Sequence, residues 1–174
     1  MASNTFVKIA SVTVGSGGSA SIDFTSIPAT YTDLAILTST RNDLADIGEN
    51  IAMQFNGDTG SNYNWRRIYG DGSAAYSDKD NPITRILSGF SNGASTTSNT
   101  FSSQQIYIPN YAGSNYKSVS TESVGEGNVS AMLMMMIAGV WNSTSAITSI
   151  KLYFPGSTKF VQYSTATLYG ISKS

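Results

Sequence analysis

Two glutamates lie close enough in the sequence to suggest acid–base chemistry. Glu122 and Glu126 flank a short segment that contains Val124 and Gly125. A glycosidase needs two carboxyl groups roughly 5 to 9 Å apart, one of them with a pKa raised by burial. The residues around this pair predict a strand end followed by a turn, where both side chains would contact water. Solvated turn residues are therefore the favoured interpretation, and we expect the protein not to be an enzyme.

Two absences from the composition narrow the chemistry further. The chain contains no His and no Cys, which excludes Ser-His-Asp and Cys-His catalysis and zinc sites built from those residues. Ten Lys and Arg residues against eleven Asp and Glu give a formal net charge of -1. No basic excess exists to neutralise phosphates. We therefore expect neither a nucleic-acid partner nor a membrane partner, and no cofactor.

Three aspartates could hold a structural calcium ion. Asp71, Asp78 and Asp80 lie in the segment 70–82, which its Gly, Asn and Pro content predicts to be a loop. Calcium prefers carboxylate and carbonyl oxygens on flexible loops. The spacing is not that of an EF-hand, and Lys79 stands between two of the aspartates. Ordinary turn formation by Asp is the favoured alternative.

An alternating aromatic set indicates either a binding face or a core face. Tyr63, Trp65, Arg67 and Tyr69 would point to the same side of one strand. Aromatic rings cover the apolar faces of sugars, and Arg bonds to sugar hydroxyls, so the set could bind carbohydrate. It could equally be the core face of a sheet, with the Tyr hydroxyls reaching the rim. Both interpretations stay open at this point.

The elements that position these residues are predicted to be strands. Short β-prone runs alternate with clusters of Gly, Asn, Pro and Ser, and no long stretch has helical periodicity. Residues 1–174 are thus expected to form a single all-β domain, an antiparallel two-sheet sandwich resembling a jelly roll, with about ten strands and short polar terminal arms. The strands at 6–14 and 20–24 are expected to form a hairpin. Residues 43–50 are the only helical candidate.

A methionine-rich run places apolar residues on both faces of one predicted strand. The run extends from Met132 to Ile137. A central strand covered on both sides is the favoured explanation. The alternative is an interface with another subunit, because Met side chains adapt to irregular partners.

Five segments together resemble the small virion structural proteins of tailed bacteriophages. They are SIPATYTDLAIL (26–37), QFNGDTGSNY (54–63), IYIPNYAGSNYKSVSTESVGE (106–126), AGVWNSTSAITSIKLY (138–153) and FVQYSTATLYGI (160–171). The resemblance covers most of the chain and rests on overall pattern, without a catalytic motif.

The resemblance implies a place on the surface of the phage particle. It implies a capsid decoration or cement protein that stabilises the shell, or alternatively a tail or fibre-tip module that binds a carbohydrate receptor. The sequence contains no heptad stretch that would form a fibrous shaft, which favours the first. The expected partners are other virion proteins, either major capsid or tail proteins, and further copies of the chain, as a homo-oligomer and most plausibly a trimer. Contacts are expected from the terminal arms and apolar loop tips, for example Phe6 and Tyr111.

Overall fold

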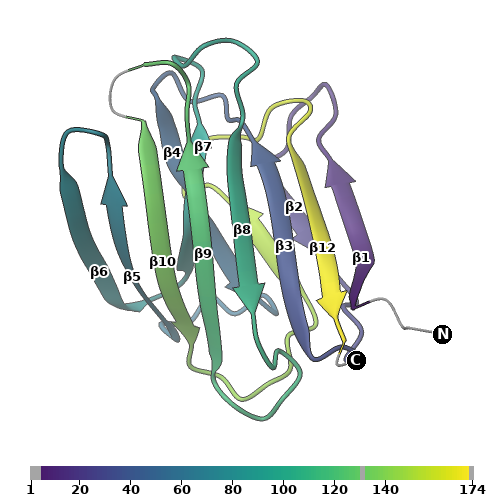
Figure 1. Cartoon of the computed structure of the whole chain (residues 1–174). Coiled ribbons are helices and arrows are strands. Elements are labelled where there is room, and N and C mark those ends of the chain that lie inside the picture. Colours follow the sequence, from purple (N-terminus) through teal and green to yellow (C-terminus); the bar gives the residue numbers. More distant parts are fainter. Residues whose placement is uncertain (1–4, 130–131, 173–174) are drawn as a thin grey trace.

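Regular alternation of buried and exposed side chains marks the central strands of the protein. In β8 (Ser102–Ile108) and β9 (Lys117–Gly125), every second side chain is buried, as expected when one face of a sheet covers a core. The computed structural model describes residues 5–129 and 132–172. Within them it contains twelve strands in two antiparallel sheets and no helix (Figure 1).

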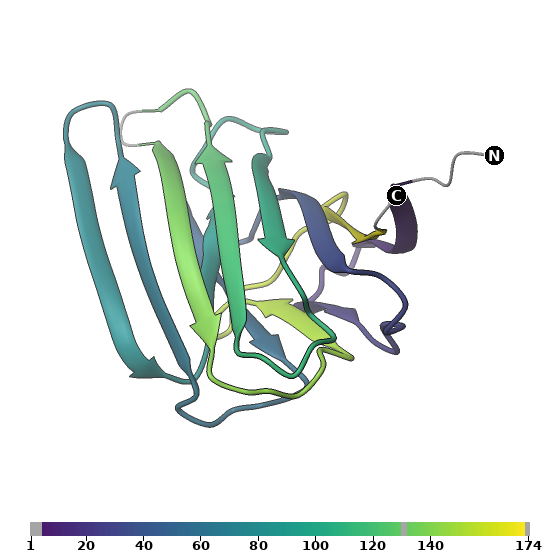
Figure 2. The same cartoon turned by 60° about the horizontal axis from the view of Figure 1, so that its bottom comes forward.

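The two sheets are unequal in size. The larger has eight strands in the order β1-β12-β3-β8-β9-β10-β5-β6, and the smaller has four in the order β2-β11-β4-β7. The remaining strands of the large sheet are β1 (Phe6–Thr13), β3 (Asp33–Thr40), β5 (Tyr63–Gly70), β6 (Ala75–Ile83), β10 (Leu133–Trp141) and β12 (Thr165–Ile171). Those of the small sheet are β2 (Ser21–Phe24), β4 (Gly48–Phe55), β7 (Ile86–Asn92) and β11 (Ile150–Tyr153). Figure 2 shows the hairpin β5–β6 extending beyond the small sheet.

The sequence-based fold class is confirmed, and four details of it are corrected. The chain is an all-β, two-sheet antiparallel sandwich, but it has twelve strands and not about ten. Segment 70–82, predicted as a loop, contains β6, and no helix forms at 43–50. The first two strands do not form a hairpin, because β1 pairs with β12 and β2 pairs with β11 in the other sheet. The division into eight and four strands does not confirm the jelly-roll arrangement.

The core fills the space between the sheets in two parts. The main cluster joins the small sheet to β3, β8 and β12, and includes the ring of Phe55 packed 5.5 Å from that of Trp141. A second, smaller cluster lies where β7 faces β10, and contains Phe90, Met135 and Ile137. The inner faces of both sheets are thus used to bury apolar surface, which is the main favourable contribution to folding.

Strand β7 ends the small sheet, yet all seven of its residues are buried. The Phe90 amide donates to Ser123 Oγ at 2.9 Å, and the Phe90 carbonyl accepts from Gln104 Nε2 at 2.9 Å. These two side chains belong to β9 and β8 of the facing sheet. A buried backbone group without a partner is costly, so polar side chains of the large sheet take the place of a neighbouring strand.

Close approach at this edge requires glycine. Gly89 has a φ of 146°, and a Cβ there would lie 2.6 Å from Gln104 Cδ and 2.9 Å from Ser123 Oγ. A Cβ on Gly125 would lie 2.5 Å from Phe90 Cδ1. Side chains at these two positions would force the sheets apart and separate the Phe90 backbone from its partners.

We predict that Ser123→Ala destabilises the fold. The substitution leaves the buried Phe90 amide without an acceptor, and the expected loss is about 1 to 3 kcal/mol of unfolding free energy, measured by urea denaturation. Ser120→Ala, on the exposed face of the same strand, is the matched control and should change stability by no more than about 0.5 kcal/mol. Equal stability of the two variants would contradict the role assigned to this hydrogen bond.

Candidate functional site

The outer face of the eight-stranded sheet is the side that the small sheet does not cover. Strand register arranges its side chains in rows that cross the strands. One row contains cross-strand partners that are all exposed, namely Leu37 on β3, Gln105 on β8, Glu122 on β9, Met136 on β10 and Ile68 on β5. The same register fixes which neighbours surround each of the remaining outward side chains.

Four exposed apolar residues form what we call the methionine patch. Its members are Ile68, Val124, Met134 and Met136, whose exposed fractions are 59 %, 42 %, 67 % and 56 %. They lie on β5, β9 and β10, the three adjacent strands at the centre of this half of the sheet. Contiguous exposed apolar surface of this kind commonly marks an interaction site.

The methionine run is covered on one side only. Met135 and Ile137 are buried against β7, whereas Met134 and Met136 point to the outer face. The prediction that the run Met132 to Ile137 is covered on both sides by the domain's own core is therefore wrong. Met134 and Met136 are thus accessible to another subunit, as the interface alternative requires.

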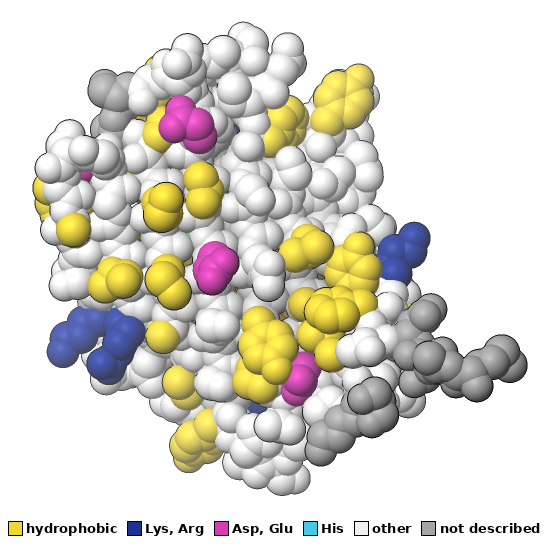
Figure 3. Space-filling view, viewed as in Figure 1, with side chains coloured by type: hydrophobic (Ala, Val, Ile, Leu, Met, Phe, Trp, Pro, Cys, Tyr) yellow, Lys and Arg dark blue, Asp and Glu magenta, His cyan; other side chains and the backbone are white. Residues whose placement is uncertain are grey.

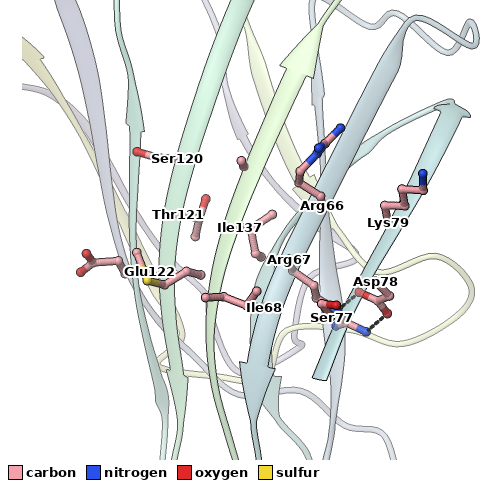
Figure 4. A pocket seen from close by; sticks show the side chains of 12 residues that line it. Arg66, Arg67, Ile68, Ser77, Asp78, Lys79, Ser120, Thr121, Glu122 and Ile137 are labelled. Atoms are coloured by element: carbon pink, nitrogen blue, oxygen red, sulfur yellow. Dashed lines mark hydrogen bonds and ion pairs between the residues drawn. The ribbon is translucent and has the colours of Figure 1, made fainter. Parts of the chain in front are cut away.

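A shallow hollow of about 690 Å³ adjoins the methionine patch (Figure 4). Arg66 and Lys79, cross-strand partners on β5 and β6, lie at one end of it. Glu122 lies at the other end on β9, and Met136 and Ile68 lie between the charges. Within the described part of the chain, none of these three charged groups forms an ion pair. The hollow therefore presents an apolar floor between unpaired charges of opposite sign.

The other half of the outer face carries what we call the aromatic patch, formed by Phe6, Leu37, Tyr107 and Tyr169. Phe6 is 58 % exposed, and its ring meets that of Tyr169 edge-on with centroids 6.3 Å apart. The Tyr107 hydroxyl donates to Asp33 Oδ2 at 2.8 Å, which raises the pKa of the Tyr107 phenol. Figure 3 shows hydrophobic side chains gathered in two areas of this face, one over β10 and β9 and one over β8, β3 and β12.

Phe6 and Tyr111, the two expected contact residues, lie in different environments. Phe6 is exposed in the aromatic patch, where a partner could reach it. Tyr111 is fully buried, and its hydroxyl donates to the Pro28 carbonyl. Its ring therefore serves the core and is removed from the expected contact set. Most of the terminal arms, residues 1–4 and 173–174, lie outside the described residues, and next to them the Ser172 amide donates to the Thr5 carbonyl at 3.0 Å.

Tyr63, the first residue of the expected sugar-binding set, is fully buried. Its hydroxyl donates to the Asp58 carbonyl at 3.0 Å and accepts from the Phe55 amide at 3.1 Å. Burial raises the pKa of Tyr63 to about 12. The side chain thus cross-links the turn after β4 to β5 and is not available to a sugar.

Trp65, Arg67 and Tyr69 share one face of β5, as predicted. That face is the inner one, where the three side chains are half-buried and occupied by the fold. Arg67 donates from Nε to Asp78 Oδ1 at 2.7 Å and from Nη2 to Asp78 Oδ2 at 2.8 Å. Its guanidinium carbon lies 4.4 Å from the ring centre of Tyr69 and 5.7 Å from that of Trp65. These contacts attach β6 to β5, and Arg67 also donates from Nη1 to Asn50 Oδ1 on β4 of the small sheet at 3.2 Å.

Trp65 also lines a small pocket that sequence reasoning did not find. The pocket has a volume of about 200 Å³, and its other walls include Glu49, Asn50, Asp80 and Arg85. These residues come from β4, β6 and the connection that precedes β7, so no local motif connects them. Hydrogen-bond donors and acceptors beside an aromatic ring suit a hydroxyl-rich ligand of the size of one sugar ring.

Three of the five acidic residues considered for catalysis or calcium serve local structure, whereas Glu122 lines the hollow and Asp80 lines the Trp65 pocket. Glu126 Oε1 accepts from the Asn128 amide at 2.7 Å in its own turn. Asp71 Oδ1 accepts from the Ser73 and Ala74 amides at 2.8 and 2.9 Å, which lowers the pKa of that carboxyl, and Asp78 pairs with Arg67. Among the described residues, no three acidic side chains come together in a group that could hold a metal ion.

Two further observations bear on the kind of protein this is. In the part of the chain that the structure describes, no helix has the length and apolar character required to cross a membrane. No family model, curated protein or solved structure matches the chain. Inference about function therefore rests on the surfaces of the chain and on the pattern of its sequence.

The carboxylate of Asp58 holds the turn after β4 against the end of the core next to Tyr63. Burial alone would raise its pKa, but hydrogen bonds from Trp141 Nε1, from the Asn62 side chain and from the Gly60 amide outweigh burial and hold the pKa of Asp58 below its ordinary value. The Trp141 contact is 2.7 Å long and joins the turn after β4 to the end of β10.

We predict that this carboxylate makes the fold sensitive to acid. Because the folded pKa lies below the unfolded one, its contribution is fully present above the unfolded value, about pH 4, and is lost as the pH falls through the folded pKa. Unfolding free energy measured by urea denaturation should fall over this window in the wild type and fall less in Asp58→Asn. Asp23→Asn, an exposed aspartate on β2, is the control. Parallel pH profiles for the wild type and Asp58→Asn would contradict the assignment.

Proposed function

We propose that the protein is a non-enzymatic structural component of a virion surface, a capsid decoration or cement protein that stabilises the shell. The observation that carries the proposal is the outer face of the large sheet, which combines exposed apolar residues with few charges. A face of this kind suits docking on another protein. The resemblance of the sequence to small phage virion proteins supports the same role.

The chemistry of the carboxyl groups supports a role without catalysis. In the described residues, the two carboxyl groups with displaced pKa values, Asp58 and Asp71, are displaced downward. General acid catalysis in a glycosidase needs an upward displacement. Both aspartates use their oxygens to accept hydrogen bonds from their own turns.

The edges of the large sheet favour docking by its face. β6, at one edge, carries Asp78, Lys79, Asp80 and Pro82. β1, at the other edge, carries Lys8 and an irregularity of register immediately after it. Charges, proline and bulges are the features that prevent edge strands from pairing with other chains. Contacts through side chains of the outer face are thus the more favourable route to assembly.

We assign docking on the shell to the aromatic patch. Aromatic residues are enriched among those that dominate binding energy at protein interfaces. Phe6 is exposed on the edge strand β1, where a neighbouring surface can reach it, and Tyr169 lies half-buried beside it on β12. Many weakly bound copies on a repeating lattice would together stabilise the shell. The partner would be a major capsid protein or, for a tail location, a tail protein.

We predict that Phe6→Ser lowers the number of copies retained on particles. Quantitative mass spectrometry of purified particles should find copy numbers on the order of hundreds for the wild type, as expected for a lattice-bound protein, and clearly fewer for the variant after a salt wash. Tyr163→Ser, an exposed aromatic in the connection before β12, should leave the number unchanged. A wild-type copy number in the tens or fewer would contradict a decoration role.

The second candidate is a carbohydrate-binding tail or fibre-tip module. The specific observation in its favour is the Trp65 pocket, with Asn50 and Arg85 among its walls. Tyr63, Arg67 and Tyr69 would then support the pocket and not contact the sugar directly, since Tyr63 is buried and Arg67 is bonded to Asp78 and Asn50.

We predict for this candidate that Trp65→Ala abolishes binding on a glycan array. Because Trp65 also packs against the core, circular dichroism must show that the variant is folded, and Asp80→Asn provides a second test from the exposed wall of the pocket. Tyr163→Ala should retain binding. Failure of the wild type to bind any glycan would eliminate the candidate and leave Trp65 as a core residue.

A further inference from the structure

The methionine patch is centred on strand β10. Strand register sets three outward rows across β9, β10 and β5. From one end of the strands to the other, the rows are Val124-Met134-Gly70, Glu122-Met136-Ile68 and Ser120-Ala138-Arg66. Each row therefore has a central residue on β10, with one neighbour on β9 and one on β5.

We propose that this half of the outer face is a homodimer interface, in which two copies pack face to face about a twofold axis that runs along β10. Under that axis, each outward residue of β10 faces its own counterpart, and β9 of one copy faces β5 of the other. Two sheets stacked in this way lie about 10 Å apart with their strands within about 30° of each other. The inference uses the geometry of the chain alone and does not rest on the proposed function.

The shapes of the facing residues are complementary. Met134 and Met136 would pack against the same residues of the second copy, and their flexible side chains can interdigitate. Val124 would face the partner's Gly70, which has no side chain to oppose it. Ala138 would face Ala138, so the sheets can approach closely at this end of the axis.

The charges are complementary as well. Glu122 would face the partner's Ile68 and lie one row from the partner's Arg66. Two residues along a strand span about 7 Å, which long side chains such as Glu and Arg bridge easily. The twofold axis repeats the contact, so that Glu122 of each copy pairs with Arg66 of the other. Within the described part of its own chain, neither residue forms an ion pair. Charge pairing across the interface fixes its register, as in other specific complexes.

The occupant is therefore a second copy of this chain and not an unrelated protein. The patch is complementary to itself, as a twofold interface requires. A trimer, expected from the sequence, would need two different surfaces that are complementary to each other. The outer face instead offers one surface that is complementary to itself, which favours a dimer. Phe6, Leu37 and Tyr169 lie on β1, β3 and β12, outside the overlap, and stay free for another partner.

Charge reversal tests the interface by sedimentation velocity over a range of concentrations. The wild type should form a dimer. Glu122→Arg alone places like charges together, as does Arg66→Glu alone, and each should raise the dimer dissociation constant about tenfold or more. The double variant Glu122→Arg/Arg66→Glu restores opposite charges and should return the constant to within about threefold of the wild type.

Asp23→Arg and Lys151→Glu are the matched controls, since these two exposed residues are cross-strand partners on the small sheet. Neither they nor their double variant should change the dissociation constant. Met136→Lys, which sets like charges on the axis, should give a monomer that retains the wild-type circular dichroism spectrum. A wild type that is monomeric at all concentrations, a trimer, or a dimer that the Glu122 and Arg66 reversals do not weaken would each overturn the proposal.

Discussion

The fold depends on how side chains of the large sheet bond to β7, the strand at one edge of the small sheet. Ser123 and Gln104 hold both backbone groups of Phe90, and Gly89 and Gly125 leave the space for that contact. Because side chains and not another strand complete this edge, the small sheet ends after four strands. The hairpin β5–β6 therefore extends past it (Figure 2). The two sheets of the sandwich thus differ in width, and side chains cover the backbone of Phe90 where the small sheet ends.

The mismatch explains where the molecule can bind and where it cannot. Inner-face residues of β5 that looked like a binding face, Trp65, Arg67 and Tyr69, hold β6 to β5 and pack against the core and the small sheet. The inner face elsewhere is filled by the core. What the large sheet offers to partners is its outer face, which is divided into the methionine patch and the aromatic patch. The two patches lie over different strands, so one could join copies while the other docks on a shell.

The sequence predicts where the strands lie better than it predicts which strands pair with each other. Alternation of apolar and polar residues identifies most strands. It does not identify β6, because this edge strand is exposed and its residues are mostly polar. A turn does form between the two strands of the expected hairpin, where the Gly18 amide donates to the Gly15 carbonyl at 3.0 Å. It nevertheless leads to the other sheet, because strand pairing is decided by distant partners. The common face of Tyr63 and Trp65 is also predictable. Its inward direction is not, since Tyr, Trp and Arg side chains suit a binding face as well as a core face.

The central claim is that the outer face of the large sheet is an interaction surface. Footprinting by dilute peroxide, with methionine sulfoxide quantified by mass spectrometry, tests it on the protein alone, because exposed methionines oxidise faster than buried ones. The account predicts that oxidation of Met134 and Met136 slows as protein concentration rises, whereas the buried Met53 stays slow throughout. Rates at Met134 and Met136 that are the same at every concentration would contradict it.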